Sequence, residues 1–211
     1  IKRRQGKAAD QARASTTDAQ ATVMKMGDGG FRPAYNPQLA SDVDSLVIVG
    51  VEVATAGSDQ GQMVPMIEQV RERCGQAPEA WLVDGGFVGH QQVEQASAHT
   101  TVYGPVPAAK DKTVDPHQPK PDDSPAVAAW RARMGTDEAK AIYKNRAATA
   151  ECVNAQSRNR GLQQFRVRGL AKVKCVVLFF ALAHNLMRMA SLAPEMLALG
   201  KGASAVSGIG A

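Results

Sequence analysis

Residues 143–160 read YKNRAATAECVNAQSRNR, a run without Gly or Pro that is rich in good helix formers. The run predicts a helix that ends at Arg160. Glu151 is its only acidic residue, and at about 100° per residue Glu151 and Arg158 share nearly the same face. A lone carboxylate among small side chains on a basic helix suits a residue that holds a cation next to a polyanion. The alternative is a solvated helix face with one stray Glu.

Charge is distributed unevenly on either side of this helix. The net charge is +5 and the pI about 9.2. Residues 41–130 contain 13 acidic and 5 basic side chains, whereas residues 131–190 contain 12 basic and 3 acidic ones. A basic C-terminal half indicates a polyanionic partner, most simply nucleic acid. A basic solvated surface is the alternative.

Composition limits the class of protein. With 211 residues, 44% of them apolar, the chain is long enough for one domain with a substantial core. Its three cysteines are odd in number and show no C-x-x-C spacing, which predicts a reducing, cytoplasmic compartment. Its four histidines show no metal-ligand spacing. We recognise no signal peptide, and the longest apolar run, residues 175–183, is too short to span a bilayer. We therefore expect no membrane partner.

Strand and helix patterns alternate before the basic helix. Residues 34–42 are extended, with Pro37 favouring a sheet edge, and residues 45–54 form a β-branched strand that completes a hairpin. Residues 60–75 have helical apolar spacing. Residues 90–98 predict a short helix and residues 101–106 a short strand.

A short apolar strand, residues 80–84, runs directly into two glycines and reads AWLVDGG with them. It would carry Asp84 to the end of a strand, where ligands collect in open α/β sheets. The glycines, Gly85 and Gly86, would let a large group come close. The alternative is an Asp that caps the following turn.

The C-terminal half predicts a loop and two helical regions. Residues 107–125 are rich in Pro and form a loop, residues 126–160 hold the basic helix with a break near Gly135, and residues 170–192 form an apolar helix that packs on the sheet. The fold class is α/β with a mixed sheet. We divide the chain into a polar basic lead-in, a catalytic domain and a flexible tail: residues 1–20, 21–192 and 193–211.

Several segments together resemble the C-terminal part of a bacterial insertion-sequence transposase of the DDE type. The resemblance implies an RNase H-like mixed sheet flanked by helices. It covers residues 15–190. The segments that carry it are STTDAQATVMKM (15–26), GFRPAYNPQLA (30–40), WLVDGGF (81–87), YKNRAATAE (143–151) and RGLAKVK…ALAHNL (168–186).

The resemblance implies roles for individual residues. Asp84 would be the second acid of the D-D-E triad and Glu151 the third, and both would be catalytic metal ligands. Tyr143, Arg146 and Arg158 match the family's Tyr-x-x-Arg…Glu…Lys/Arg signature. Arg146 lies well round a regular helix from Glu151, so we expect it to touch DNA or fix the fold. The residues expected to contact DNA are Tyr143, Arg146, Arg158, Arg160, Arg166 and Arg168.

The chain departs from the family at the first Asp of the triad. The pattern shows no strand before residue 34 that could hold this Asp, so we expect a truncated domain that lacks its first strand. Among the acids that remain, three stand in polar or turn contexts and two near strand ends, where we expect only supporting or turn roles. These are Asp10, Asp18, Asp28, Asp42 and Asp59.

The implied chemistry is transposition. Two Mg²⁺ ions about 4 Å apart would activate the attacking oxygen and stabilise the leaving one, first in strand cleavage and then in strand transfer. Mg²⁺ prefers carboxylate oxygens, and Mn²⁺ can substitute. The partners would be element-end and target DNA, on which the protein assembles as a homo-oligomer. Two alternatives remain open: a non-catalytic DNA-binding remnant and an unrelated RNase H-like nuclease.

Overall fold

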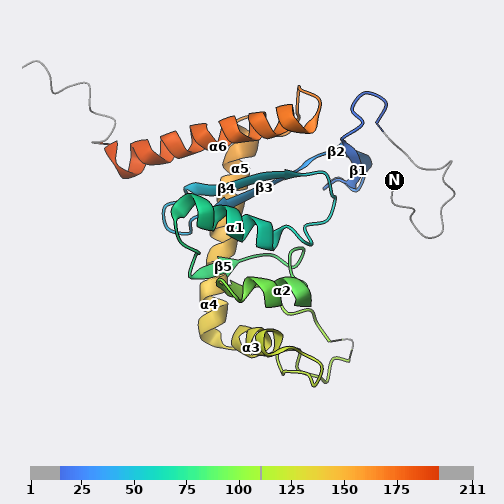
Figure 1. The fold of residues 1–211 in the computed structure, drawn as a ribbon, viewed down its shortest axis with the longest axis vertical. Helices are drawn as coiled ribbons and strands as arrows, with labels where there is room; N and C mark the ends of the chain where they lie inside the picture. The colour runs from blue at the N-terminus through green and yellow to red at the C-terminus, as the bar shows by residue number, and fades with distance from the viewer. Residues whose placement is uncertain (1–14, 110, 195–211) are drawn as a thin grey trace, which may run out of the picture.

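The structure is a computed structural model that describes residues 15–109 and 111–194, and it is an α/β fold as the sequence predicts (Figure 1). The expected lead-in and tail fall mostly outside these residues. The strands are β1 (Thr22–Lys25), β2 (Phe31–Ala34), β3 (Asn36–Ser41), β4 (Ile48–Ala54), β5 (Ala80–Leu82) and β6 (Thr101–Tyr103). The helices are α1 (Met63–Cys74), α2 (His90–Ala96), α3 (Pro125–Met134), α4 (Asp137–Arg146), the π-helix η2 (Ala147–Glu151), α5 (Cys152–Asn159) and α6 (Leu170–Leu192).

The strands form three separate two-stranded sheets, so the prediction of one mixed sheet is wrong in its connectivity. β1 pairs with β2 and β3 with β4 in antiparallel fashion, whereas β5 pairs with β6 in parallel. No ladder joins β3 to β5 among the described residues. Residues 22–34 fold as a hairpin, which Gly29 allows by adopting a φ of 82°, and its strands β1 and β2 contain no Asp that could be the first acid of the triad.

The predicted hairpin of β3 and β4 is confirmed, but its turn is longer than expected. The Ser45 N–H and hydroxyl both donate to Asp42 Oδ1, at 2.8 and 2.6 Å, and these bonds lower the pKa of Asp42. Leu46 adopts a positive φ of 59°. The β-branched pattern therefore becomes a strand only from Ile48 onward. The Asp42 carboxylate serves this turn.

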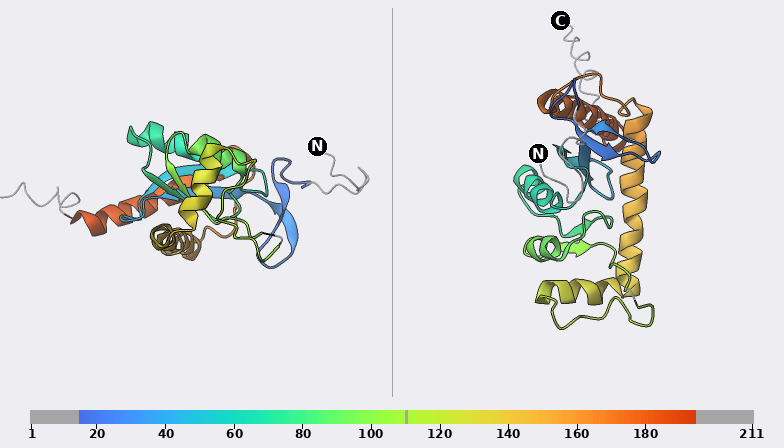
Figure 2. Two further views of the ribbon diagram at one scale, coloured as in Figure 1. Left: turned by 90° about the horizontal axis from the view of Figure 1, so that it is seen from below. Right: turned by 90° about the vertical axis from the view of Figure 1, so that its right-hand side faces the viewer.

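The basic helix of residues 143–160 is the middle and end of a long continuous rod made of α4, η2 and α5. The rod runs along one side of the other elements, which stack against it (Figure 2). It follows the predicted break at Gly135, begins where Thr136 Oγ1 accepts the Ala139 N–H, and ends at Arg160 before Gly161, at φ 102°. Its central turn is a π-helix, which the sequence analysis does not predict.

Two large apolar clusters, and a small third one made of Ala40, Met66 and Val70, hold the described residues together. One fills the space between β5, β6 and helices α1 to α3, and its largest member is the fully buried Trp130. The other packs β4 against α5 and α6, which confirms that the apolar helix lies on a sheet. Outside that contact, α6 carries large apolar side chains that are exposed to solvent, including Phe179, which is 66% exposed.

Helix α6 is also long and apolar enough, by length and composition alone, to cross a membrane. Its most apolar 18-residue window has a mean hydropathy of 1.6, and 17% of that window is buried. The helix, Leu170–Leu192, is therefore longer than the uninterrupted apolar run of residues 175–183 within it.

Candidate active site

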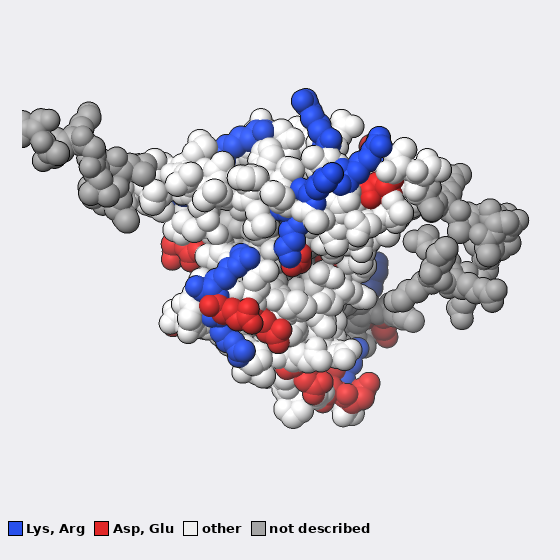
Figure 3. Space-filling view, turned by 45° about the horizontal axis from the view of Figure 1, so that its top comes forward, with Lys and Arg blue, Asp and Glu red and all other residues white. Residues whose placement is uncertain are grey.

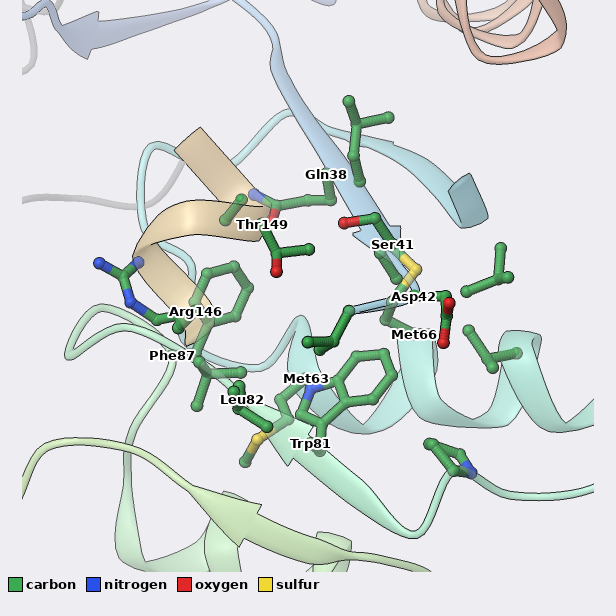
Figure 4. A pocket seen from close by; sticks show the side chains of 18 of the residues that line it. Gln38, Ser41, Asp42, Met63, Met66, Trp81, Leu82, Phe87, Arg146 and Thr149 are labelled. Carbon is green, nitrogen blue, oxygen red and sulfur yellow. The ribbon is translucent and has the colours of Figure 1, made fainter. Parts of the chain in front are cut away.

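A cavity of about 780 Å³ lies between β3 and β5 and contains Asp84 in its lining. Met63 and Met66 of α1 line one side of it, and Arg146 and Thr149 of the rod line the other (Figure 4). All residues of strands β3 and β5 line the cavity. The cavity therefore brings the end of β5 next to the π-helical turn that ends in Glu151.

Asp84 sits just beyond the end of β5, as predicted. Its Oδ1 accepts the Gly86 N–H at 2.8 Å, and its carbonyl accepts the Phe87 N–H at 3.2 Å. The turn-capping role that the sequence left open is therefore present. The side chain is still 48% exposed, so capping leaves part of the carboxylate available to a ligand.

Arg146 approaches Asp84 from the rod. Its Nη1 lies 4.0 Å from Asp84 Oδ2, and its guanidinium lies 5.8 Å from the centre of the Tyr143 ring. Burial raises the pKa of Tyr143, while the positive charge of Arg146 opposes this rise. This arrangement agrees with a role for Arg146 in fixing the fold, and it gives Asp84 a counter-charge.

Asp59, for which the sequence pattern predicts only a supporting or turn role, lies close to Asp84 in the structure. Asn36 and Gln38 of β3 each donate to Asp59 Oδ1 at 2.7 Å. The other oxygen, Oδ2, and Asp84 Oδ1 each lie 3.1 Å from the place where a Cβ on Gly86 would stand. The two carboxylates are thus at most twice that distance apart, with only a glycine between them. No sequence motif indicated this pairing, because it depends on how the loop after β4 folds.

The remaining candidates for a first acid have structural roles. Tyr35 and the Gly169 N–H both donate to Asp18 Oδ2, at 2.8 and 2.9 Å, and the bond from Gly169 lowers the pKa of Asp18. Asp28 pairs with Arg32 across its own turn. Asp10 lies outside the described residues.

Glu151 is exposed at the end of η2, while Thr149 and Ala150 of the same turn line the cavity. No ion pair or hydrogen bond joins it to Asp84 among the described residues. The Thr149 hydroxyl donates to the Asn145 carbonyl at 2.8 Å, a bond that commonly distorts helices. The hydrogen bonds of a π turn span five residues, so Arg146, five residues before Glu151, is nearer to the face of Glu151 than a regular helix would place it.

A search with models of known protein families matches residues 109–190 to the transposase DDE domain. Residues 109–190 are therefore similar to a DDE transposase domain, and we refer to them as the DDE region. The match includes Glu151, Arg146 and Tyr143, and leaves Asp84 outside its limits. No curated protein and no solved structure matches the chain significantly.

The basic residues of the DDE region lie mainly at the surface. Lys and Arg side chains predominate over the upper part of the face in Figure 3, and acidic side chains over its lower part. Arg160 contacts His184 Nδ1 at 3.4 Å, and Arg146 lies in the cavity. The arginines that are exposed are Arg158, Arg160, Arg166 and Arg168.

The described residues contain no group of three or more His, Cys, Asp or Glu side chains arranged to hold a metal ion. Asp59 and Asp84 provide the nearest donor set, because both present a carboxylate oxygen beside Gly86. Hard oxygen donors of this kind suit Mg²⁺, which usually takes one or two protein carboxylates. These two carboxylates therefore provide part of the ligand set that a divalent cation requires.

Proposed function

We propose that the chain is part of the catalytic domain of a DDE transposase that cleaves and joins DNA at element ends. The observation that carries the proposal is the match of residues 109–190 to the transposase DDE domain, with Glu151 on a π turn that borders the cavity of Asp84. Single π turns frequently mark functional sites. The RNase H-like fold and the bacterial, cytoplasmic setting belong to the same proposal.

Asp84 and Glu151 would hold the divalent cations, with Mg²⁺ the expected ion and Mn²⁺ a substitute. The ions would supply charge stabilisation and activate the attacking oxygen during in-line phosphoryl transfer. Arg146 would orient the Asp84 carboxylate, since its Nη1 lies 4.0 Å from Asp84 Oδ2. Asp59 would add a third carboxylate from the Asn36 and Gln38 side of the cavity.

The catalytic state of residues 1–211 is a separate part of the proposal. We infer that these residues lack the first Asp of the triad, because the described alternatives, Asp59 included, lie in turns or loops and none stands on a strand. Such a chain binds a metal weakly and does not turn over DNA.

Two other functions remain to be distinguished from this one. A non-catalytic DNA-binding remnant would need no metal at all. An unrelated RNase H-like nuclease would show no preference for element ends, whereas a transposase assembled on DNA as a homo-oligomer would show one.

Binding of duplex DNA tests the proposed partner. Exposed arginines that contact phosphates release counterions, so the logarithm of the binding constant should fall with the logarithm of salt concentration by about 0.9 for each phosphate neutralised. We expect the double change Arg166→Gln and Arg168→Gln to reduce that slope by about two and to weaken binding equally on all sequences.

The matched control removes two exposed basic residues elsewhere, by Lys25→Gln and Arg71→Gln, and should leave the slope unchanged. Fluorescence titration at several salt concentrations provides the measurement. Absent binding at low salt, or binding indifferent to salt, would contradict the assignment of these arginines to DNA.

A further inference from the structure

Helix α6 lies at one end of the molecule, with β4 and α5 on its inner side (Figures 1 and 2). Polar side chains hold this inner face to the hairpin of β3 and β4. The Asn185 amide bonds to both the N–H and the carbonyl of Ile48, each at 2.8 Å. The buried His184 donates from Nε2 to the Leu46 carbonyl at 2.8 Å. The helix is therefore anchored along one face as a fixed part of the fold.

The outer face of α6 is apolar and exposed. The described residues contain eight large apolar side chains that are exposed, and five of them lie together on this side of the helix: Leu178, Phe179, Leu182, Leu186 and Met187. At about 200 Å² for each such residue, exposed fractions of 39–66% leave on the order of 500 Å² of apolar surface. Monomeric proteins rarely expose a contiguous apolar patch larger than a few hundred Å². The face is therefore of a size that marks an interaction site.

The centre of this outer face has the spacing of a coiled coil. Its residues follow one another by four, three, four and three positions: Cys175, Phe179, Leu182, Leu186 and Met189. At 3.6 residues per turn they fall within about 80° of one another, opposite the buried side of the helix. An apolar repeat of 3.5 residues packs against a second helix at a crossing angle of about 20°. We call these five residues the outer stripe, and its spacing indicates another helix as the partner.

The charges of α6 favour an antiparallel helix of the same kind. The helix has no acidic residue. Two of its basic side chains are engaged with the hairpin, since Lys174 bonds to Glu52 at 2.8 Å and Arg188 donates to a backbone carbonyl at 2.7 Å. The third, Lys172, is exposed in the first turn. An antiparallel copy would place each Lys172 beside the last turn of the other helix, where backbone carbonyls carry partial negative charge. A parallel copy would bring both lysines and both positive helix ends together.

We propose that the outer stripe of α6 binds the same stripe of a second copy of this chain, as an antiparallel helix pair about a two-fold axis near Leu182. A two-fold interface uses one patch twice and must be self-complementary, as an apolar stripe without acids is. A stable interface buries about 800 Å² on each partner. The five large side chains supply more than half of this, and small exposed residues of the same face add to it: Cys175, Ala183 and Ala190.

A lipid surface fits the outer stripe less well. Helices that lie in a membrane interface carry a strongly charged face opposite the apolar one. The face of α6 opposite the stripe instead packs on β4 and is held there by the contacts of His184 and Asn185. A second copy of the chain therefore accounts better for the stripe.

Sedimentation equilibrium of residues 1–211, without DNA or metal, tests the proposal, and we expect a dimer at micromolar concentration. The double change Phe179→Glu and Leu186→Glu should raise the dissociation constant of the dimer by about a hundredfold or more, because the added carboxylates would be buried without partners. Circular dichroism should stay unchanged, since these side chains are 66% and 48% exposed in the single chain. The matched control, Phe31→Glu with Val114→Glu, alters apolar side chains that are 59% and 47% exposed elsewhere and should leave the dimer intact.

Disulfide formation tests the orientation of the two helices. The three cysteines, Cys74, Cys152 and Cys175, are free, and all can be changed to Ser. In that background Leu182→Cys should link two copies on oxidation, because the two-fold axis brings these positions together. A chain that keeps Cys175 alone should not link, because an antiparallel pair separates the two copies of this residue by about 21 Å, at 1.5 Å per residue.

Three results would overturn the proposal. They are a chain that stays monomeric at all concentrations, a dimer that survives Phe179→Glu with Leu186→Glu, and a monomer that sediments with phosphatidylcholine vesicles, which would assign the stripe to lipid. Linkage through Cys175 would overturn the antiparallel arrangement. The proposal deepens the homo-oligomer of the proposed function by giving it a surface. Since no readout here uses DNA or metal, its failure is distinguishable from failure of the transposase assignment.

Discussion

In a chain extended by a strand that carries the first Asp of the triad, Glu151→Gln is expected to abolish cleavage of element-end DNA while leaving DNA binding nearly intact. Gln keeps the size of the side chain and removes the charge that binds the cation. Loss of groups that merely support a metal ligand costs about 10–100-fold, so loss of a ligand should cost at least that. A strand-cleavage assay with Mn²⁺ measures the effect, beside a filter-binding assay on the same DNA.

The control for this change is Glu138→Gln, which removes an exposed acid from the first turn of α4 and should leave cleavage unaltered. The same assay on residues 1–211 alone should show no cleavage. Robust cleavage by that short chain would mean that the first acid is already present. Asp59 would then be the residue to change first, because it lies across Gly86 from Asp84.

Arg131→Met is expected to destabilise the protein by about 3–5 kcal/mol, because it leaves a buried carboxylate without its partner. Arg131 Nε lies 2.6 Å from Asp123 Oδ2, and the two side chains are only 4% and 2% exposed. Arg131 also donates to the Pro116 carbonyl at 3.2 Å. The substitution would therefore release the loop before α3 as well as unpair the charge. Urea unfolding gives the change in the free energy of unfolding.

Acid should remove part of the same stabilisation. Burial raises the pKa of Asp123, but the Lys120 N–H and Arg131 more than offset this and hold the pKa below its ordinary value. A carboxyl with a lowered folded pKa stabilises the fold above its unfolded pKa and loses that contribution as the pH falls through the folded value.

The control for Arg131 is Lys140→Met, which breaks an ion pair whose side chains are 54% and 99% exposed. Surface pairs of this kind contribute about 0–1 kcal/mol. If Arg131→Met were no more destabilising than Lys140→Met, the buried pair would have no special role in holding the loop.

The local pattern of the chain predicted most of its elements. Apolar spacing placed α1, and Gly75, at φ 76°, ends it as expected. The break at Gly135 and the end of the rod at Arg160 also followed from local signals. These successes share a cause, since each depends on residues close in sequence.

The features that the sequence did not reveal depend on contacts between distant residues. Asp59 meets Asp84 only because Asn36 and Gln38 hold its loop against β3. The separation of the sheets follows from the cavity between β3 and β5. The π turn has no signal in a run of Ala and Thr, because Thr149 distorts a helix only when its hydroxyl bonds backward.

We propose that Asp84 and Glu151 share a metal cluster, and a calorimetric Mn²⁺ titration of four forms of the chain tests this directly. These are the unmodified chain, Asp84→Asn, Glu151→Gln and the double variant. If the carboxylates lie within roughly 8 Å, as two ions about 4 Å apart require, each single change should weaken binding and their effects should not add. Mn²⁺ binding by Glu151→Gln that equals binding by the unmodified chain would contradict the claim.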